Sequence, residues 1–520
     1  MADVVGLQPI ASPPRPKHRS RLFVLKMSAA MALRIFNTVT GEKEPFVPLH
    51  PPRVGLYVCG PTVYDLSHIG HARVYVAFDV VVRVLRARGF EVTYVRNFTD
   101  VDDKIIRRAT ELCEAPAALS ERFTAAYLED MARLGVQRAD VEPKVTDHLP
   151  EIVALITRLV ANGLAYASEG DVYFAVRRFP SYGKLSRRKL DDLRSGARVE
   201  PGEQKHDPLD FALWKAAKPG EPCWESPWGR GRPGWHIECS AMSEKYLGET
   251  FDLHAGGKDL VFPHHENEIA QSEGASGKPF VKVWMHNGFV TLDQEKMSKS
   301  LGNFFTIREV LKKFEPEALR FFLLGTHYRS PLNFSDVGLA EAERRLDYLY
   351  ETLLKAEELA AGQATVSAQP GLPAEPPAEL PPFRVTLEAA LDDDFNTPEA
   401  LAALSAPFSR LNELCGKPVK GAERKVAVAE AAALIASLRQ ATSVLGLCGE
   451  SPAAYLARRY ARVAAERGLD EKHVEALVLA RTAARAGKDF ARADALRQEL
   501  AALGVELKDS AAGTAWKPIS

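Results

Sequence analysis

Apolar residues in the first third of the chain alternate between short continuous runs and longer runs with helical spacing. Residues 54–58 form a short apolar run suited to a buried strand, and residues 72–88 have the length and spacing of a helix. Residues 91–96 supply a second strand-prone run, and helical spacing returns from Lys104 onward. This order of elements is typical of a parallel sheet, so we expect the first half of an α/β fold.

The pattern changes in the middle of the chain. Residues 148–234 predict one helix followed by loops rich in Gly, Pro and Trp, which indicates an inserted module. Strand-like runs return at residues 251–254, 281–285 and 289–292, so a segment distant in sequence is expected to complete the sheet. Residues 311–361 then have helical spacing.

The last third of the chain and its N-terminus differ in composition from the segments between them. Residues 364–382 contain six prolines and no aromatic residue, which predicts an extended linker. Helical spacing then continues to about Leu503, where Gly504 ends the last helix before a strand-prone tail. Residues 1–32 hold four prolines and five Lys or Arg against one acidic residue, without amphipathic spacing; we expect a disordered extension rather than a targeting segment.

Composition narrows the class of protein. A chain of 520 residues is longer than one hydrophobic core usually serves, so we expect about three or four domains. No apolar run approaches the length of a membrane span, and a net charge of -1 neither demands nor excludes a nucleic-acid partner. Six cysteines are too few for a disulfide scaffold, which favours a cytoplasmic protein whose thiols remain available to a metal.

A first candidate site follows the predicted strand at residues 54–58. The string from Cys59 to His71 ends in His68-Ile69-Gly70-His71, where the next helix is expected to begin. Backbone N–H groups and the helix dipole favour phosphate at such a position, and two histidines one turn apart can donate to its oxygens. Two surface histidines near a helix start would give the same short string, so it is weak evidence alone.

A second candidate site is the string Lys296-Met297-Ser298-Lys299-Ser300. Two lysines beside a triphosphate stabilise the charge that develops as pyrophosphate leaves, and Lys299 is the better candidate, with Lys296 assisting. A solvated Lys/Ser loop would have the same composition. The two motifs in this order together match the two signatures of class I aminoacyl-tRNA synthetases, which makes the resemblance definite.

A third set, scattered along the chain, has the chemistry of zinc ligands: Cys59, Cys239, His264 and Glu268. His264 and Glu268 are four residues apart, so a helix would place both on one face and direct His265 elsewhere. Lone cysteines are more often small buried hydrophobic residues, and the spacing supports only part of this set.

Three longer strings resemble those of the cysteinyl-tRNA synthetases. They are Tyr57-Val-Cys59-Gly-Pro-Thr-Val-Tyr-Asp65, Gly234-Trp-His-Ile-Glu-Cys239-Ser-Ala-Met242 and Phe262-Pro-His-His-Glu-Asn-Glu268. The resemblance runs from about residue 33 to residue 517 and includes the ending Gly513-Thr-Ala-Trp516. Only the N-terminal extension lies outside it.

The resemblance implies an α/β fold: a Rossmann-like parallel-sheet catalytic domain with an inserted connective module, then a C-terminal all-helical bundle and a small anticodon-binding domain. The expected units are 1–32 extension, 33–147 first catalytic half, 148–234 connective module, 235–310 second catalytic half, 311–363 helical stem-contact region, 364–382 linker, 383–450 helical bundle and 451–520 anticodon-binding domain.

The resemblance also implies an activity and its residues. L-cysteine would be activated with ATP and Mg²⁺ and transferred to tRNA(Cys), with one Zn²⁺ per chain and a monomeric enzyme. The expected residues are Cys59, Cys239, His264 and Glu268 for zinc; His68, Gly70, His71, Gly256, Gly257, Asp259 and Lys299 for ATP; Thr99, Trp235 and His254 for cysteine; His68, His71, Lys296 and Lys299 for catalysis; and Arg485, Asp494, Arg497 and Asp509 for the anticodon.

Three other interpretations compete with this one. A ligase that joins cysteine to a small amino sugar would share the active site, but it lacks the resemblance to an anticodon module after the linker. A zinc peptidase is disfavoured because the chain has no His-Glu-x-x-His helix. A catalytically inactive RNA-binding homologue would have no use for intact His68, His71, Lys296 and Lys299.

Overall fold

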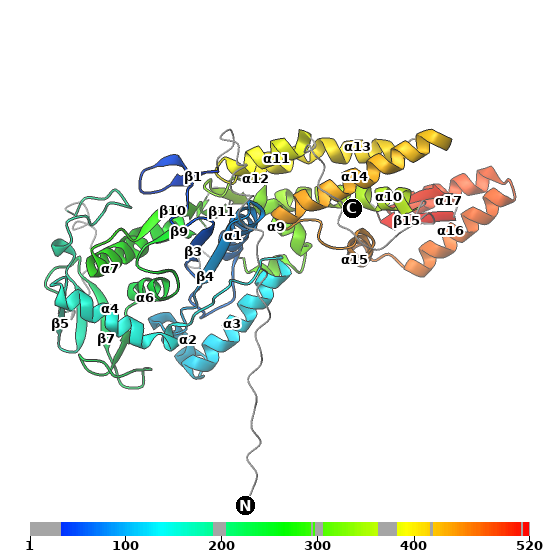
Figure 1. The fold of residues 1–520 in the computed structure, drawn as a ribbon. Helices are drawn as coiled ribbons and strands as arrows, with labels where there is room; N and C mark the ends of the chain where they lie inside the picture. Colours follow the sequence, from blue (N-terminus) through cyan, green and yellow to red (C-terminus); the bar gives the residue numbers. More distant parts are fainter. Residues whose placement is uncertain are drawn as a thin grey trace, which may run out of the picture.

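The computed structural model describes residues 33–190, 204–292, 295–296, 305–361, 382–416, 420–510 and 513–518. Figure 1 shows an elongated molecule with the main sheet near one end and helices α16 (Glu471–Ala486) and α17 (Phe490–Ala502) at the other. Within the described ranges, no helix has both the length and the apolar character needed to cross a bilayer. The predicted extension lies outside these ranges, as does the predicted linker apart from Pro382, the first residue of α11.

A four-stranded parallel sheet organises the N-terminal half. Its spatial order is β10 (Val281–Asn287), β9 (Phe251–Gly257), β3 (Arg53–Val58) and β4 (Glu91–Arg96). All seven residues of β9 are buried, as expected for a central parallel strand covered on both faces. Each of these strands was predicted from the sequence, and the pairing of β3 with β9 confirms that a distant segment completes the sheet.

Helix α1 (Ile69–Ala87) connects β3 to β4 and begins directly after His68. It corresponds to the predicted helix at residues 72–88, with its start three residues earlier. Thirteen of its nineteen residues are buried, since the helix lies between the sheet and the helices that follow it. The first turn of α1 is therefore held in a fixed position beside the end of β3.

The prediction for residues 148–234 was wrong in part. The expected helix is present as α4 (Leu149–Ala161), but the segment after it forms an antiparallel sheet and not only loops. Its strands, in order, are β5 (Ala165–Ser168), β6 (Asp171–Phe174), β7 (Phe211–Ala216) and β8 (Gly231–Pro233). Strands of three to six residues carry too little pattern to be recognised alone, and their stability comes from partners across the sheet.

Among the remaining elements, the C-terminal helices and the hairpin β14–β15 agree with the predicted order, whereas β1, β2 and α6 were not predicted and the short strand β13 interrupts the predicted helical region 311–361. Their bounds are β1 (Arg34–Asn37), β2 (Glu42–Pro45), α2 (Asp103–Glu111), α3 (Pro116–Arg133), α6 (Trp235–Leu247), η5 (Val261–His265), α7 (Glu266–Ser276), β11 (Val290–Leu292), β12 (Glu295–Lys296), α8 (Ile307–Val310), α9 (Pro316–Leu324), β13 (Leu332–Phe334), α10 (Asp336–Ala361), α11 (Pro382–Asp392), α12 (Thr397–Ala403), α13 (Ser405–Gly416), α14 (Gly421–Leu445), α15 (Pro452–Glu466), β14 (Val505–Ser510) and β15 (Gly513–Pro518).

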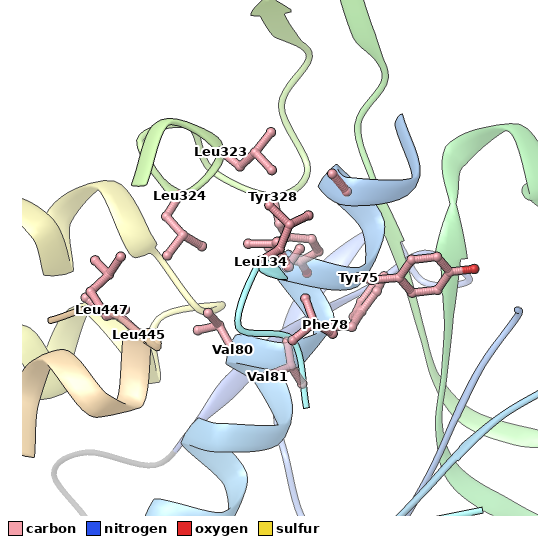
Figure 2. Packing of buried hydrophobic residues seen from close by; sticks show 14 of the residues in the cluster. Tyr75, Phe78, Val80, Val81, Leu134, Leu323, Leu324, Tyr328, Leu445 and Leu447 are labelled. Carbon is pink, nitrogen blue, oxygen red and sulfur yellow. The ribbon is translucent and has the colours of Figure 1, made fainter. Parts of the chain in front are cut away.

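Helix α1 also joins the sheet to the C-terminal helices through a buried junction with α9 and α14. Figure 2 shows buried side chains of this junction: Tyr75, Phe78, Val80, Val81, Leu134, Leu323, Leu324, Tyr328, Leu445 and Leu447. Within it, Arg320 of α9 pairs with Asp79 of α1, and each side chain is 1% exposed. Arg320 also donates to the backbone oxygens of Leu445 and Leu134, at 2.8 and 3.1 Å.

Replacing Asp79 by Ala is expected to lower the free energy of unfolding by about 3–5 kcal/mol, because Arg320 would remain buried without its counter-ion. Urea unfolding followed by circular dichroism measures the change. The matched control is Glu341→Ala in the exposed Glu341–Arg345 pair of α10, where we expect a loss below about 1 kcal/mol. Equal losses in the two variants would contradict the structural role of the buried pair.

Candidate active site and metal centre

The carboxyl ends of the parallel strands surround a cavity of about 360 Å³. Cys59 follows β3, Gly257 ends β9 and Asn287 ends β10, and all three line the cavity. This edge is where open α/β sheets bind their ligands. The other lining residues are Gly60, Pro61, Thr62, Tyr64, His68, Gly70, His71, Val74, Tyr75, Lys104, Trp235, Asp259, Leu260, Gly288, Phe289 and Val290.

The first predicted motif forms one wall of this cavity at the start of α1. The backbone N–H of His68 donates to Nδ1 of His71 at 3.2 Å, and the two ring centroids are 3.9 Å apart. A Cβ atom on Gly70 would lie 2.7 Å from the His68 ring, so any other residue there would push this ring out of its position. The structure therefore brings both imidazoles and a helix N-terminus to the cavity, an arrangement suited to phosphate.

The other predicted ATP-binding residues have different positions. Gly257 and Asp259 line the cavity, whereas Gly256 lies behind it, where an added Cβ would be 2.9 Å from the His265 ring. Lys296 ends the short strand β12, whose backbone pairs with β11. Lys299 lies outside the described residues.

Four buried side chains from three parts of the chain, Cys59 among them, meet beside the cavity. The sulfurs of Cys59 and Cys239 are 3.8 Å apart, and Cys59 Sγ is 3.6 Å from Glu268 Oε1. Nε2 of His264 is 3.1 Å from the same carboxylate oxygen. Cys239 comes from α6, His264 from η5 and Glu268 from α7. The four predicted metal ligands are thus assembled in one place.

The expectation that His265 points elsewhere was wrong. Its Nε2 is 3.3 Å from Cys59 Sγ, and its Nδ1 is 2.8 Å from Nε2 of His286. The chain bends at Phe262, before both histidines, and Glu268 lies four residues after His264 and three after His265, so one carboxylate is within reach of both rings. Both imidazoles therefore approach Glu268. The sequence signal for His286 was only one more histidine in a strand.

The predicted cysteine-pocket residues fall into two layers. Trp235 lines the cavity and stacks on His264, with centroids 4.4 Å apart and ring planes at 25°. Thr99 and His254 are buried behind the cavity; the Thr99 hydroxyl donates to Glu238 at 2.8 Å, and His254 Nε2 lies 2.8 Å from Glu268 Oε2. Sequence reasoning missed Lys104, whose ammonium group lies over the Trp235 ring at 5.9 Å.

The ionisation of the cluster follows from burial and mutual contact. Burial raises the pKa of the Cys59 thiol, whereas the hydrogen bond from Cys59 lowers the pKa of Cys239 to about 6. Burial lowers the pKa of His264, but Glu268 and Cys239 outweigh it and raise this pKa to about 10. Burial raises the pKa of Glu268, but His254 and His264 outweigh that effect and hold it well below its usual value. At pH 7 the cluster holds two anions and an imidazolium.

The donor set fits a zinc ion. Bonds of about 2.0–2.3 Å in a tetrahedron separate neighbouring ligand atoms by about 3.3–3.8 Å. The three recorded separations, 3.8, 3.6 and 3.1 Å, agree with this requirement to within about 0.2 Å. A second, overlapping set of candidate ligands replaces Cys239 and His264 by His254 and His265; in each set all four residues are buried and Cys59 is the member that lines the cavity.

The predicted anticodon residues lie at the opposite end of the molecule (Figure 1). Arg485 of α16 and Asp509 of β14 form an ion pair at 2.6 Å. Asp494 and Arg497 are exposed on α17. Two of the four predicted residues, Arg485 and Asp509, are therefore in direct contact with each other.

Three family models match the chain in succession. They describe the "tRNA synthetases class I (C) catalytic domain" at residues 45–344, the "DALR domain" at 387–449 and the "Cysteinyl-tRNA ligase anticodon binding domain" at 468–516. The solved Mycobacterium tuberculosis methionyl-tRNA synthetase in complex with methionyl-adenylate has a similar fold, with a TM-score of 0.55 and 16% identity over 77% of this chain and 92% of that chain. The parallel sheet, its cavity and the matching catalytic model define a class I aminoacyl-tRNA synthetase.

The relatives identify the particular synthetase. The chain is 60% identical over 493 residues to the cysteine--tRNA ligase of Anaeromyxobacter dehalogenans strain 2CP-C, which covers 94% of this chain and 100% of the relative. It is 53% identical over 488 residues to that of Geobacter sulfurreducens, with the same coverage. The chain belongs to the cysteine--tRNA ligase family.

Zinc binding to the metal-free cluster at pH 7 is expected to release about two protons, since ligation requires deprotonated Cys59 and His264, whose pKa values both lie above 7. The affinity should therefore rise about 100-fold per pH unit near neutrality. Calorimetric titration with Zn²⁺ in buffers of different ionisation enthalpy measures the released protons. Cys415→Ser, in the distant helix α13, is the control and should release the same number. A binding heat that does not depend on the buffer would contradict the assignment.

Proposed function

We propose that this ligase selects cysteine through a zinc ion held by Cys59, Cys239, His264 and Glu268. The convergence of two sulfurs, an imidazole and a carboxylate at tetrahedral separations supports this proposal most strongly. Zinc can expand from four to five ligands, and Cys59 is part of the cavity wall, so the substrate sulfur would bind as a fifth ligand from the cavity side.

Zinc would supply a borderline-soft centre that prefers a thiolate to a hydroxyl group. Cysteine and serine differ in one atom, and a pocket that relies on shape discriminates such near-isosteres only about 100-fold. The role of the protein is to hold the ligands, to cover the small substrate with the Trp235 indole and to keep Glu268 ionised through His254. Serine has no thiolate form and gains nothing from this arrangement.

Activation would use the opposite wall of the same cavity. The α-carboxylate of the substrate is already ionised at pH 7 and attacks the α-phosphate of ATP without a general base. His68, Gly70 and His71 are suited to bind phosphate at the start of α1, while Asp259 is suited to accept from ribose hydroxyl groups. Lys299, assisted by Lys296, would stabilise the departing Mg²⁺-bound pyrophosphate.

The C-terminal region would bind tRNA(Cys), with the anticodon read within residues 451–520. Arg485, Asp494, Arg497 and Asp509 supply hydrogen-bonding groups on α16, α17 and β14. The DALR and anticodon-binding models after the linker disfavour the alternative of a ligase that acts on a small amino sugar. We propose a monomeric enzyme that acts in the cytoplasm.

Replacing Cys239 by Ala is expected to remove zinc and cysteine-dependent pyrophosphate exchange together, and to reduce the preference for cysteine over serine to about 100-fold or less. Metal content by plasma emission spectroscopy and exchange kinetics with both amino acids measure these effects. Cys415→Ala is the matched control and should keep both properties. A zinc-free Cys239→Ala variant that still rejects serine as the wild type does would refute the proposal.

A further inference from the structure

Asp509 of β14 is bound on both of its carboxylate oxygens by side chains of the protein itself. Arg481 of α16 donates through Nη1 to Oδ1 and through Nη2 to Oδ2, each at 2.8 Å. The Thr514 hydroxyl donates to Oδ1 at 2.6 Å, and Nη1 of Arg485 donates to Oδ2 at 2.6 Å. A carboxylate offers about four acceptor sites, so these four donors fill the capacity of Asp509.

The two arginines that share Asp509 differ in their access to solvent. They are four residues apart on α16 and lie on the same face of the helix. The Arg481 side chain is 6% exposed, whereas that of Arg485 is 48% exposed. Arg481 is therefore enclosed between α16 and the β14–β15 hairpin, while Arg485 presents guanidinium donors to the outside.

A cavity of about 620 Å³ lies beside this group. Arg485 and Asp509 line it together with Phe490, a residue that is 63% exposed at the start of α17. A guanidinium fork beside an exposed aromatic ring suits a planar base whose edge carries hydrogen-bond acceptors. An amino group of a base could approach Asp509 only by displacing one of its four donors.

We propose that Asp509 does not read a base directly, and that Arg481 and Asp509 are positioning residues that hold Arg485, whose guanidinium reads the acceptor edge of one anticodon base. This inference rests on the proposed anticodon role of residues 451–520, within which it replaces direct reading by Asp509 with an indirect role. Holding the Arg485 side chain in place before tRNA arrives reduces the conformational entropy lost on binding, which is how an indirect contact improves recognition. Arg481 is thereby assigned a function although a ligand cannot reach it.

The test compares Arg481→Met, Arg485→Met and the double variant on tRNA(Cys) transcripts with the native anticodon and with each anticodon base changed singly. Arg485→Met is expected to lower kcat/KM for the native transcript about 10- to 100-fold and to abolish the preference at one base. Arg481→Met is expected to abolish the preference at the same base. The double variant should lose no more than the more affected single variant, and pyrophosphate exchange should remain unchanged in all three.

A merely structural role for Arg481 gives a different result. Loosening of the hairpin would lower the aminoacylation of all transcripts by the same factor, without changing the preference for any base. Arg481→Lys keeps the charge but cannot form the paired contact, so it should show an intermediate loss at the same base even if Arg481→Met folds poorly. Lys472→Met, at an exposed position in the first turn of α16, is the matched control and should behave as the wild type.

The outcomes separate this inference from the function on which it rests. If Arg485→Met abolishes a base preference and Arg481→Met and Arg481→Lys do not, the positioning role is refuted and the anticodon function stands. If Asp509→Asn removes further base preference in the Arg485→Met background, Asp509 reads a base directly and the inference is wrong. If Arg485→Met leaves the preference for every anticodon base intact, Arg485 does not read a base. Its proposed anticodon role and this inference then both fail.

Discussion

The structure of the active site depends on keeping one carboxylate charged where water cannot reach it. Glu268 is fully buried, and an isolated carboxylate in such surroundings would take up a proton. His254 and His264 contact its two oxygens, at 2.8 and 3.1 Å, and together they keep it ionised. Removal of either imidazole would leave the charge of Glu268 only partly compensated. The elements that carry these three residues, β9, η5 and α7, must therefore keep their relative positions.

This constraint explains why the site is assembled from distant segments at the edge of a rigid sheet. Cys59 follows β3, His254 belongs to β9 and Cys239 to α6, so each element contributes a side chain that it could not place alone. The Trp284 indole stacks on His254, with centroids 4.4 Å apart, and packs one of the groups that orient Glu268. A metal ion bound by ligands supported in this way would distinguish one substrate atom, as proposed above, because such ligands do not rearrange freely.

At the opposite end of the molecule, the carboxylate of Asp509 is also held by protein donors, but it is less buried than that of Glu268. The Asp509 side chain is 40% exposed, so the Coulomb attraction is screened by solvent. Burial therefore does not fix the position of the Asp509 carboxylate. The two hydrogen bonds from the enclosed Arg481 to its two oxygens fix it instead. In both places the side chain that orients the carboxylate, His254 or Arg481, does not line the adjoining cavity.

The sequence by itself determined the elements with strong periodicity and the identity of the chemical groups. The strands of the parallel sheet and helix α1 were predicted because apolar spacing is a local property, whereas the set of four candidate metal ligands depended on the resemblance of three longer strings to a family. The antiparallel strands β5 to β8 were missed because three to six residues carry little pattern and depend on cross-strand partners. Only the tertiary structure decided that His265 reaches Cys59 and His286, and that Arg481 is enclosed beside Asp509, since those positions are set by packing between segments that the chain brings together from far apart.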